Sequence, residues 1–361
     1  MSRTLARYLV AVSLCWLPLF LRPLPVSAFI AGVSLDRGEL NQAAGDTVTL
    51  QFTLEADCAA TLFVTDAHGH LVRTFYQRQT QLAGTYQEVW DGRDDYGNPV
   101  IDGIYFPIIR CLSSRQGVAA YNPTAFTWGR PVVPQGVRYD ADQQQLHFSV
   151  PTRAYGRLRV GLQEGGPIYK TLAGWRLWRP GEHQLSWDGR DQEGYQRVVD
   201  QELFAYSFDF FSLPPTTVVV SGSSEAAYLP QPDYQQYRIQ APGGMAPFYA
   251  TYASAQAAEP VLQGQWQGVR YRDQRPVLRG QAVYQVWFAE PAHRSSRLGS
   301  GSELVLYVND VFVAETPVEG LPARIVFATD GFANGSHRVT INLFTNDDRA
   351  GIIIDQVIIE N

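Results

Sequence analysis

One pentapeptide, Trp-Asp-Gly-Arg-Asp, occurs twice in this 361-residue chain, and it constrains the fold more than any other feature of the sequence. The copies begin 97 residues apart, and in each a glycine stands three residues after the last aspartate. The repeated positions are Trp90, Asp91, Gly92, Asp94 and Gly97 in the first copy and Trp187, Asp188, Gly189, Asp191 and Gly194 in the second. A period of this size fits one whole β-sandwich per repeat and is too long for a solenoid unit.

Alternating apolar residues predict strands in both repeats. Val48, Leu50, Phe52 and Leu54 alternate with polar or small neighbours, as in a half-buried strand. Near the end of the second repeat, an aromatic residue stands at every second position from Phe204 to Phe210. A content of 31 Gly, 22 Pro and 12% aromatic residues also favours strands and turns over helices. We therefore predict an all-β protein of tandem sandwiches, immunoglobulin-like or fibronectin-like.

The repeats and a change in composition place the domain boundaries. We predict two sandwich domains at residues 29–120 and 121–218, followed by a connector rich in Pro, Gln and Tyr at residues 219–271. A third sandwich is expected at residues 272–361, where two apolar runs meet across Asn309-Asp310, a typical hairpin turn.

The first 28 residues have the pattern of a cleaved signal peptide. Arg3 and Arg7 precede an apolar run at residues 9–20, and Val26-Ser27-Ala28 ends in small residues suited to cleavage. An uncleaved anchor is the alternative, although the apolar run is short for a membrane span. We expect a periplasmic or extracellular protein with no membrane span after cleavage.

Charge argues against nucleic acid as a partner. Residues 1–28 hold three arginines and no acid, so their removal changes the formal net charge from −6 to −9. An acidic chain without a basic run lacks the electrostatic footprint of a nucleic-acid-binding protein.

Two cysteines remain after cleavage, and both fall in phase with the core-facing residues of their predicted strands. In an oxidising compartment an isolated pair suggests one disulfide, between Cys58 and Cys111. Two buried free thiols are the alternative.

The repeated segments resemble the Ig-like domain of bacterial flagellar hook-capping (FlgD-type) proteins. That pattern includes an Asp-x-x-Gly-x-x-Val turn, here Asp66, Gly69 and Val72, and the Trp-Asp-Gly-x-Asp-x-x-Gly motif of both copies. The resemblance implies two tandem Ig-like domains, and this module also recurs in exported and surface proteins. The C-terminal segment, with Leu306 to Asp310 and Ala333 to Thr340, resembles another bacterial Ig-like domain.

The aspartates of the motif allow two interpretations. Asp91, Asp94 and Asp95 lie close enough in sequence to contribute oxygen ligands to calcium. The spacing is not that of an EF-hand, and aspartates in turns commonly accept hydrogen bonds from nearby backbone amides. We therefore predict a structural turn, with a calcium site as the alternative and no resident cofactor.

Trp175 and Trp178 are the aromatic candidates for a ligand platform. In a stretch that ends at Pro180 they would stack on sugar rings or anchor a protein if exposed. We favour the interpretation that one or both fill the core of the sandwich, as tryptophans near strands usually do, with the ligand platform as the alternative.

Known catalytic motifs are absent from the sequence. It has no Gly-x-Ser-x-Gly elbow, His-Glu-x-x-His motif or phosphate-binding loop. We predict an exported, non-catalytic structural or adhesive scaffold that binds other envelope or surface proteins. One alternative is a carbohydrate-binding accessory protein with polysaccharide as its partner, and another is an enzyme whose site lies in the C-terminal region.

Overall fold

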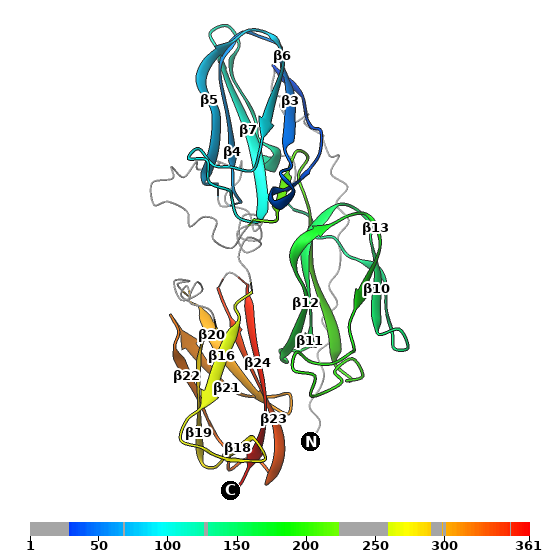
Figure 1. Ribbon diagram of the computed structural model, residues 1–361, viewed down its shortest axis with the longest axis vertical. Helices are drawn as coiled ribbons and strands as arrows, with labels where there is room; N and C mark the ends of the chain where they lie inside the picture. The colour runs from blue at the N-terminus through cyan, green and yellow to red at the C-terminus, as the bar shows by residue number, and fades with distance from the viewer. Residues whose placement is uncertain are drawn as a thin grey trace, which may run out of the picture.

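The computed structural model describes residues 29–67, 69–125, 129–223, 259–289, 298, 301–346 and 348–361. The predicted signal peptide and most of the predicted connector lie outside these ranges. The described residues form three β-sandwich units (Figure 1), which confirms the all-β prediction. Within them, no helix has the length and apolar character needed to cross a membrane.

The first unit packs a three-stranded sheet against a larger one. The small sheet has the order β1-β3-β6, and the large one runs β2-β15-β7-β4-β5, with β8 also paired to β7. The elements are β1 (Ile30–Leu35), β2 (Glu39–Asn41), η1 (Gln42–Ala44), β3 (Val48–Leu54), β4 (Cys58–Thr65), β5 (Leu71–Gln81), β6 (Gly84–Trp90), β7 (Gly103–Ser113), β8 (Gly117–Tyr121) and η2 (Pro123–Ala125). The alternation predicted for β3 is confirmed, because its four apolar residues are all buried.

One strand of the first unit comes from a distant part of the chain. β15 (Val218–Ser221) lies between β2, to which it is parallel, and β7, to which it is antiparallel. Its three valines are buried. The second unit is thus inserted between two strands of the first, and the predicted start of the connector at residue 219 needs correction.

The second unit is built from β9 (Gln135–Asp140), β10 (Gln145–Val150), β11 (Ala154–Leu162), β12 (Ile168–Trp178), β13 (Gly181–Ser186) and β14 (Phe204–Ser212). Its sheets have the orders β13-β10-β9 and β12-β11-β14. The aromatic alternation of β14 faces the core as predicted, where Phe208 and Phe210 pack on Phe148.

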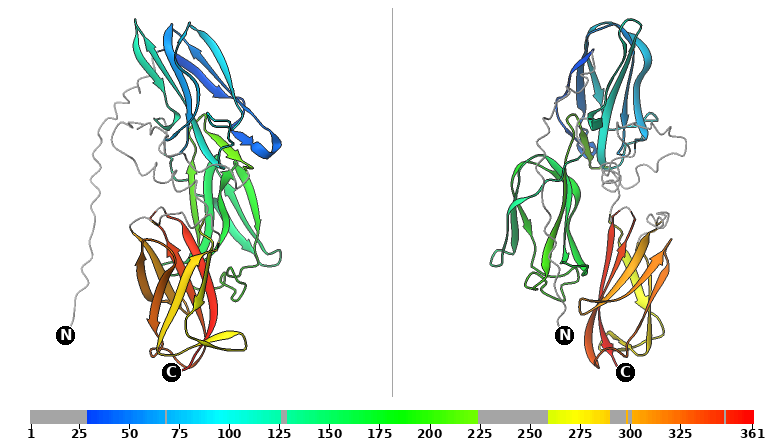
Figure 2. Two further views of the ribbon diagram at one scale, coloured as in Figure 1. Left: turned by 60° about the vertical axis from the view of Figure 1, so that its left-hand side comes forward. Right: turned by 180° about the vertical axis from the view of Figure 1, so that it is seen from behind.

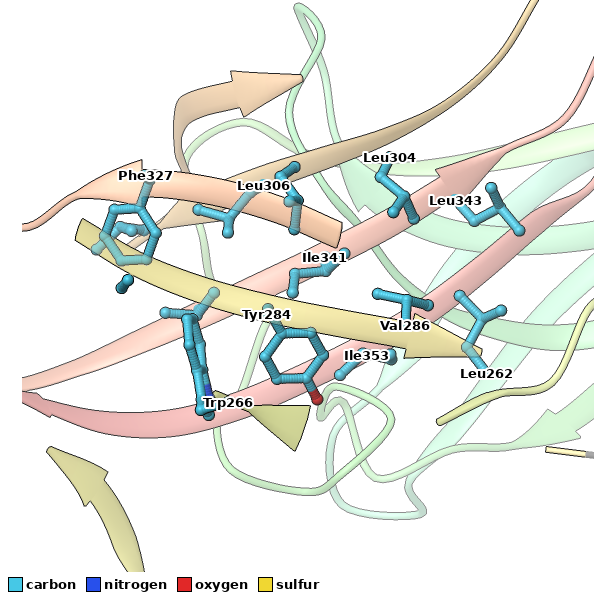
Figure 3. Packing of buried hydrophobic residues seen from close by; sticks show 14 of the residues in the cluster. Leu262, Trp266, Tyr284, Val286, Leu304, Leu306, Phe327, Ile341, Leu343 and Ile353 are labelled. Atoms are coloured by element: carbon cyan, nitrogen blue, oxygen red, sulfur yellow. The ribbon is translucent and has the colours of Figure 1, made fainter. Parts of the chain in front are cut away.

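The third unit begins within the predicted connector, at residue 262. Its strands are β16 (Leu262–Trp266), β17 (Arg270–Arg272), β18 (Arg275–Leu278), β19 (Gln281–Phe288), β20 (Ser302–Val308), β21 (Val311–Val318), β22 (Ala323–Ala328), β23 (Gly335–Phe344) and β24 (Ala350–Ile359). They form the sheets β16-β19-β22 and β17-β18-β24-β23-β20-β21, between which Trp266, Tyr284 and aliphatic residues pack (Figure 3). The predicted hairpin is confirmed, since Val308 pairs with Val311 and both turn residues have positive φ.

Candidate functional site

The first copy of the motif is a tight turn that follows β6. The indole N–H of Trp90 donates a hydrogen bond to the carbonyl oxygen of Arg93 at 2.9 Å. Asp94 is fully buried, and its Oδ1 accepts the backbone N–H groups of Tyr96 and Asn98 at 2.9 and 2.8 Å. Gly92 has φ +75°, a backbone conformation that residues with a side chain rarely adopt. The repeated residues therefore close one compact loop.

The second copy builds the same turn. The indole of Trp187 donates to the carbonyl oxygen of Arg190 at 2.8 Å, and Gly189 has φ +77°. Asp191 is buried and accepts the N–H groups of Tyr195 and Gln196 at 2.8 and 3.1 Å. The backbone N–H of Asp94 donates to the carbonyl oxygen four residues later, at Asn98, whereas that of Asp191 donates five residues later, to Gln196. This shift agrees with the one-residue insertion between Gly194 and Val198.

The aspartates of the calcium interpretation all accept backbone hydrogen bonds. Asp91 accepts from the N–H of Arg93 at 3.1 Å, and Asp95 accepts from the N–H of Thr74 at 2.8 Å. With Asp94 also engaged, each carboxylate has a structural role in the turn. In the part of the chain that the structure describes, no group of three or more His, Cys, Asp or Glu side chains is placed to hold a metal ion. The geometry favours the turn interpretation.

The two turns differ in what covers them. Trp90 belongs to an apolar cluster with Leu40 of β2 and Val218 and Val220 of β15, all within the first unit. Trp187 belongs to a cluster that includes Ile352 and Ile354 of β24, in the third unit. The second turn is thus part of an interface between units.

A buried arginine joins the second and third units. The side chain of Arg157 on β11 is completely buried, and its guanidinium contacts Asp209 at 2.8 Å, Glu259 at 2.9 Å and Asp348 at 2.5 Å. Burial lowers the pKa of Arg157, but Glu259, Asp209 and Asp348 outweigh it and hold the pKa above its ordinary value. Glu259 also accepts the N–H of Ala350, so the cluster is tied to β24. Removing the arginine would leave three carboxylates close together.

Side chains of the third unit also bind the edge of β12. The amide of Asn342 accepts the backbone N–H of Ile168 at 2.9 Å and donates to its carbonyl oxygen at 3.0 Å. Arg338 contacts Asp310 and lies 3.6 Å from Asp191 of the second turn. Asn342 lies on the outer face of β23 and is fully buried, so the second unit covers this side of the third.

The first and second units meet through the larger sheet of the first unit and the sheet β12-β11-β14 of the second. Ile104 and Phe106 of β7 pack with Tyr155 and Phe211 of the second unit in one apolar cluster. At its margin Arg153 donates to the carbonyl oxygen of Gly38 at 2.8 Å. The three units are therefore connected by two buried interfaces.

Trp175 and Trp178, the candidates for a ligand platform, do not form an exposed aromatic surface. Both tryptophans lie on strand β12, not in a loop. Trp178 is 1% exposed, its indole donates to the carbonyl oxygen of Gly156, and it stacks on Phe210. Trp175 is half-buried against Tyr155 and beneath the guanidinium of Arg157. These rings pack in the core and at an interface, which favours the core interpretation of Trp175 and Trp178 over the ligand platform.

Cys58 and Cys111 form a disulfide, with a Cα–Cα distance of 5.6 Å. Both side chains are buried in the apolar cluster of the first unit, as their predicted phase required. The bond joins β4 and β7 across 53 residues of sequence.

An open hollow of about 410 Å³ lies beside the first turn. It is lined by Gln42, Ala43, Gly45, Asp46, Asp91, Arg93, Pro99 and Gly222. These residues include no serine, cysteine or histidine, so they offer no paired nucleophile and base.

Sequence reasoning missed the residues that join the units. Arg157 and Arg159 interrupt an otherwise apolar strand between Tyr155 and Val160. A charged residue in such a position implies a buried partner, and this signal was available in the sequence. The sequence did not indicate which acids pair with these arginines, because Asp348 lies 191 positions from Arg157.

Comparison with known proteins identifies the first unit. The family model of the FlgD Ig-like domain matches residues 38–106, which run from the residue before β2 into β7. The match covers about a fifth of the chain, and the chain therefore carries a FlgD Ig-like domain. No curated protein matches the chain.

Among the solved structures to which the chain is similar, three illustrate the range. FlgD from P. aeruginosa is 20% identical, with 34% of this chain and 83% of that chain covered and a TM-score of 0.20. A 1.5-MDa bacterial ice-binding adhesin covers 92% of this chain and 98% of its own at 11% identity and a TM-score of 0.19. The fibronectin-III array of RIM-binding protein covers 92% and 97% at 11% identity and a TM-score of 0.18. At these TM-scores the similarity supports no conclusion about function.

Proposed function

We propose that this chain, whose first unit is a FlgD Ig-like domain, is an exported, non-catalytic scaffold of the bacterial cell envelope. In this role its sandwiches hold binding surfaces for other envelope or surface proteins at fixed separations. The pattern of residues 1–28 supports export.

The two buried interfaces carry this proposal. Interfaces within a chain usually permit domain motion unless they are large and apolar. Here the first interface is an apolar cluster of both units, and the return of β15 into the first sheet connects them a second time. The second interface combines apolar residues with the buried Arg157 cluster. A rigid array of sandwiches suits a spacer, whereas an enzyme with a closing cleft needs a hinge.

Distance measurement between spin labels tests the rigidity. Gln87 of β6 and Gln281 of β19 are exposed sites at which cysteines would accept labels in the first and third units. Apart from these two introduced cysteines, the chain without its first 28 residues has no free thiol, because Cys58 and Cys111 are bonded to each other. We expect one narrow distance distribution. Arg157→Met should broaden it, whereas Arg138→Met, at an exposed position on β9, should not. A broad distribution in the parent chain would contradict the proposal.

Fractionation of the producing bacterium tests export. The expected product begins at Phe29 and is found outside the cytoplasm. Accumulation of the full-length chain in the cytoplasm would refute this part of the proposal.

A further inference from the structure

The outer face of the sheet β16-β19-β22 has a composition unlike the interfaces described above. Residues of these strands that face inward, such as Trp266, Tyr284 and Phe327, fill the core (Figure 3). The alternate positions therefore face outward. They are Gln263 and Gln265 of β16, Gln281, Val283, Gln285 and Trp287 of β19, and Arg324, Val326 and Ala328 of β22. All of these side chains are exposed or half-buried.

Among the residues that the structure describes, neither of the other two units covers this face of the third unit. The opposite sheet meets the second unit through Asn342, Ile352 and Ile354. β23 and β24 lie toward β11 and β12, whereas β19 and β22 lie on the far side (Figure 1). Figure 2 shows the same separation from two further directions. A ligand therefore reaches the outer face of β16-β19-β22 without displacing another unit.

The register assembles the polar groups into rows. Trp287 lies opposite Gln263, and Gln285 lies between Gln265 and Arg324. Directly opposed side chains of antiparallel strands are about 5 Å apart. The next row pairs Val283 with Val326, whose exposed fraction is 45%. Three glutamine amides, a guanidinium and an indole thus share a small, flat area.

The indole of Trp287 leans across the sheet. Its N–H donates to the Oε1 of Gln263 on the neighbouring strand at 3.3 Å. This bond directs the nitrogen-bearing edge of the ring toward β16 and leaves the half-buried side chain on the outer side of the sheet. An accessible aromatic ring beside hydrogen-bonding amides provides an apolar surface and polar contacts together.

The chemistry of the face selects its ligand class. Amides both donate and accept hydrogen bonds, as sugar hydroxyls do, and a guanidinium donates several. None of the nine outward residues is an acid, and Arg324 is their one cation. A polyanion such as nucleic acid requires several cations, and a charged protein surface requires complementary charges. Binding of a neutral hydroxylated polymer requires neither several cations nor complementary charges on the face.

We propose that the outer face of β16-β19-β22 binds a neutral polysaccharide, with Trp287 stacking on a sugar ring and Gln263, Gln265, Gln285 and Arg324 hydrogen-bonding to hydroxyl groups. This inference goes beyond the scaffold role and is independent of it.

The first unit provides an internal control for this face. The outward residues of its small sheet include Gln51 opposite Gln87 and Thr53 opposite Thr85. This face is also rich in amides and hydroxyls and free of charge, but it has no aromatic ring. Comparison of the two faces reports the joint contribution of the indole and of Arg324, which the first-unit face also lacks.

Affinity electrophoresis of the purified chain tests the proposal. The probes are four soluble neutral polysaccharides: a β-1,3-glucan, hydroxyethyl cellulose, an arabinoxylan and a galactomannan. We expect at least one of them to retard the parent chain. Trp287→Ala should weaken that binding by about tenfold or more, which corresponds to the loss of roughly 1.4 kcal/mol from aromatic stacking. Gln285→Ala should weaken it several-fold, and Gln87→Ala in the first unit should leave it unchanged.

Folding of the variants is monitored separately. Trp287 is outside the core, so Trp287→Ala should melt within a few degrees of the parent chain. Trp287→Tyr should keep part of the affinity because it retains a ring. The proposal is overturned if none of the four polysaccharides retards the parent chain, or if Trp287→Ala binds as the parent does. Binding of a protein at this face that Trp287→Ala abolishes, without polysaccharide binding, would also overturn it.

Discussion

The two tryptophan turns have nearly the same hydrogen bonds and different neighbours. Trp90 and Trp187 each donate to the carbonyl oxygen three residues later, and Asp94 and Asp191 each accept two backbone N–H groups. The first turn is covered by β2 and β15 of its own unit, whereas the second shares a cluster with Ile352 and Ile354 of the third unit. The motif thus determines the local turn and leaves open which segment completes the core around it.

Replacing each tryptophan is expected to separate local from interface effects. Trp90→Ala and Trp187→Ala should each cost about 3–5 kcal/mol of unfolding free energy, as large core aromatics do. Trp90→Ala should increase hydrogen exchange in the first unit alone. Trp187→Ala should also increase exchange in β23 and β24, because its cluster includes residues of β24. Hydrogen-exchange mass spectrometry of the two variants measures this, and unchanged exchange in β24 for Trp187→Ala would contradict the comparison.

The disulfide is a second difference between the units. In the first unit Ala60 of β4 pairs with Cys111 of β7. In the second unit Gly156 of β11 pairs with Phe210 of β14, so that Phe210 takes the place of Cys111. There the core is filled by Trp178, Phe148 and Phe210. Replacing both cysteines with alanine releases a loop of 53 residues, for which chain entropy predicts a loss of about 4 kcal/mol.

Guanidinium denaturation combined with hydrogen exchange checks this prediction. The loss should be confined to the first unit, and the parent chain treated with reductant should show the same loss. An equal loss in the second unit would show that the units do not differ in this respect.

The buried aspartates should matter more than the exposed ones in both turns. Asp94→Ala and Asp191→Ala remove acceptors of two backbone N–H groups each, which is worth roughly 1.5–3 kcal/mol for a charged acceptor. Asp191→Ala should cost more than Asp94→Ala, because it also removes one of the two carboxylates near Arg338, leaving only Asp310. Asp91→Ala and Asp188→Ala should cost about 0.5 kcal/mol.

Thermal melting with and without calcium extends this test. Calcium should not change the melting temperature of the parent chain. A calcium-dependent rise that Asp94→Ala abolishes would favour the calcium interpretation over the turn.

The repeat and the alternation were enough to predict the strands, because each depends on neighbouring residues. The turn of Trp90, the buried face of β3 and the hairpin at Asn309-Asp310 are of this kind. The placement of β15 was not predictable. This strand has only four residues and follows a proline-containing segment, so its sequence gives no local signal of the strand with which it pairs. The burial of Trp178 was favoured from the general tendency of tryptophan to fill cores, but its place in a strand was not predicted, because Pro180 suggested a loop and β12 extends to Trp178 itself. The interfaces depend on contacts between residues more than a hundred positions apart, which periodicity does not encode.

The smallest expected difference between the two units is a dependence on pH. His70 lies at the end of the turn between β4 and β5. Its ring Nδ1 is 2.9 Å from Oδ2 of Asp66, and its backbone N–H donates to Oδ1 of the same carboxylate. The hydrogen bond to Asp66 raises the pKa of His70 above its ordinary value, against a smaller effect of burial. The turn between β11 and β12 spans residues 163–167 and has no histidine.

Because the folded state holds this proton more tightly than the unfolded state, His70 stabilises the first unit below the unfolded pKa of about 6.5. That contribution is lost as the pH rises through the raised pKa of the folded state. We expect the free energy of opening of the first unit, measured by hydrogen exchange from pH 5 to pH 8, to fall more steeply in the parent chain than in His70→Gln. Peptides of the second unit, recorded in the same experiment, should respond equally in both proteins. Parallel curves for the first unit would show that the contact between Asp66 and His70 does not distinguish the two turns.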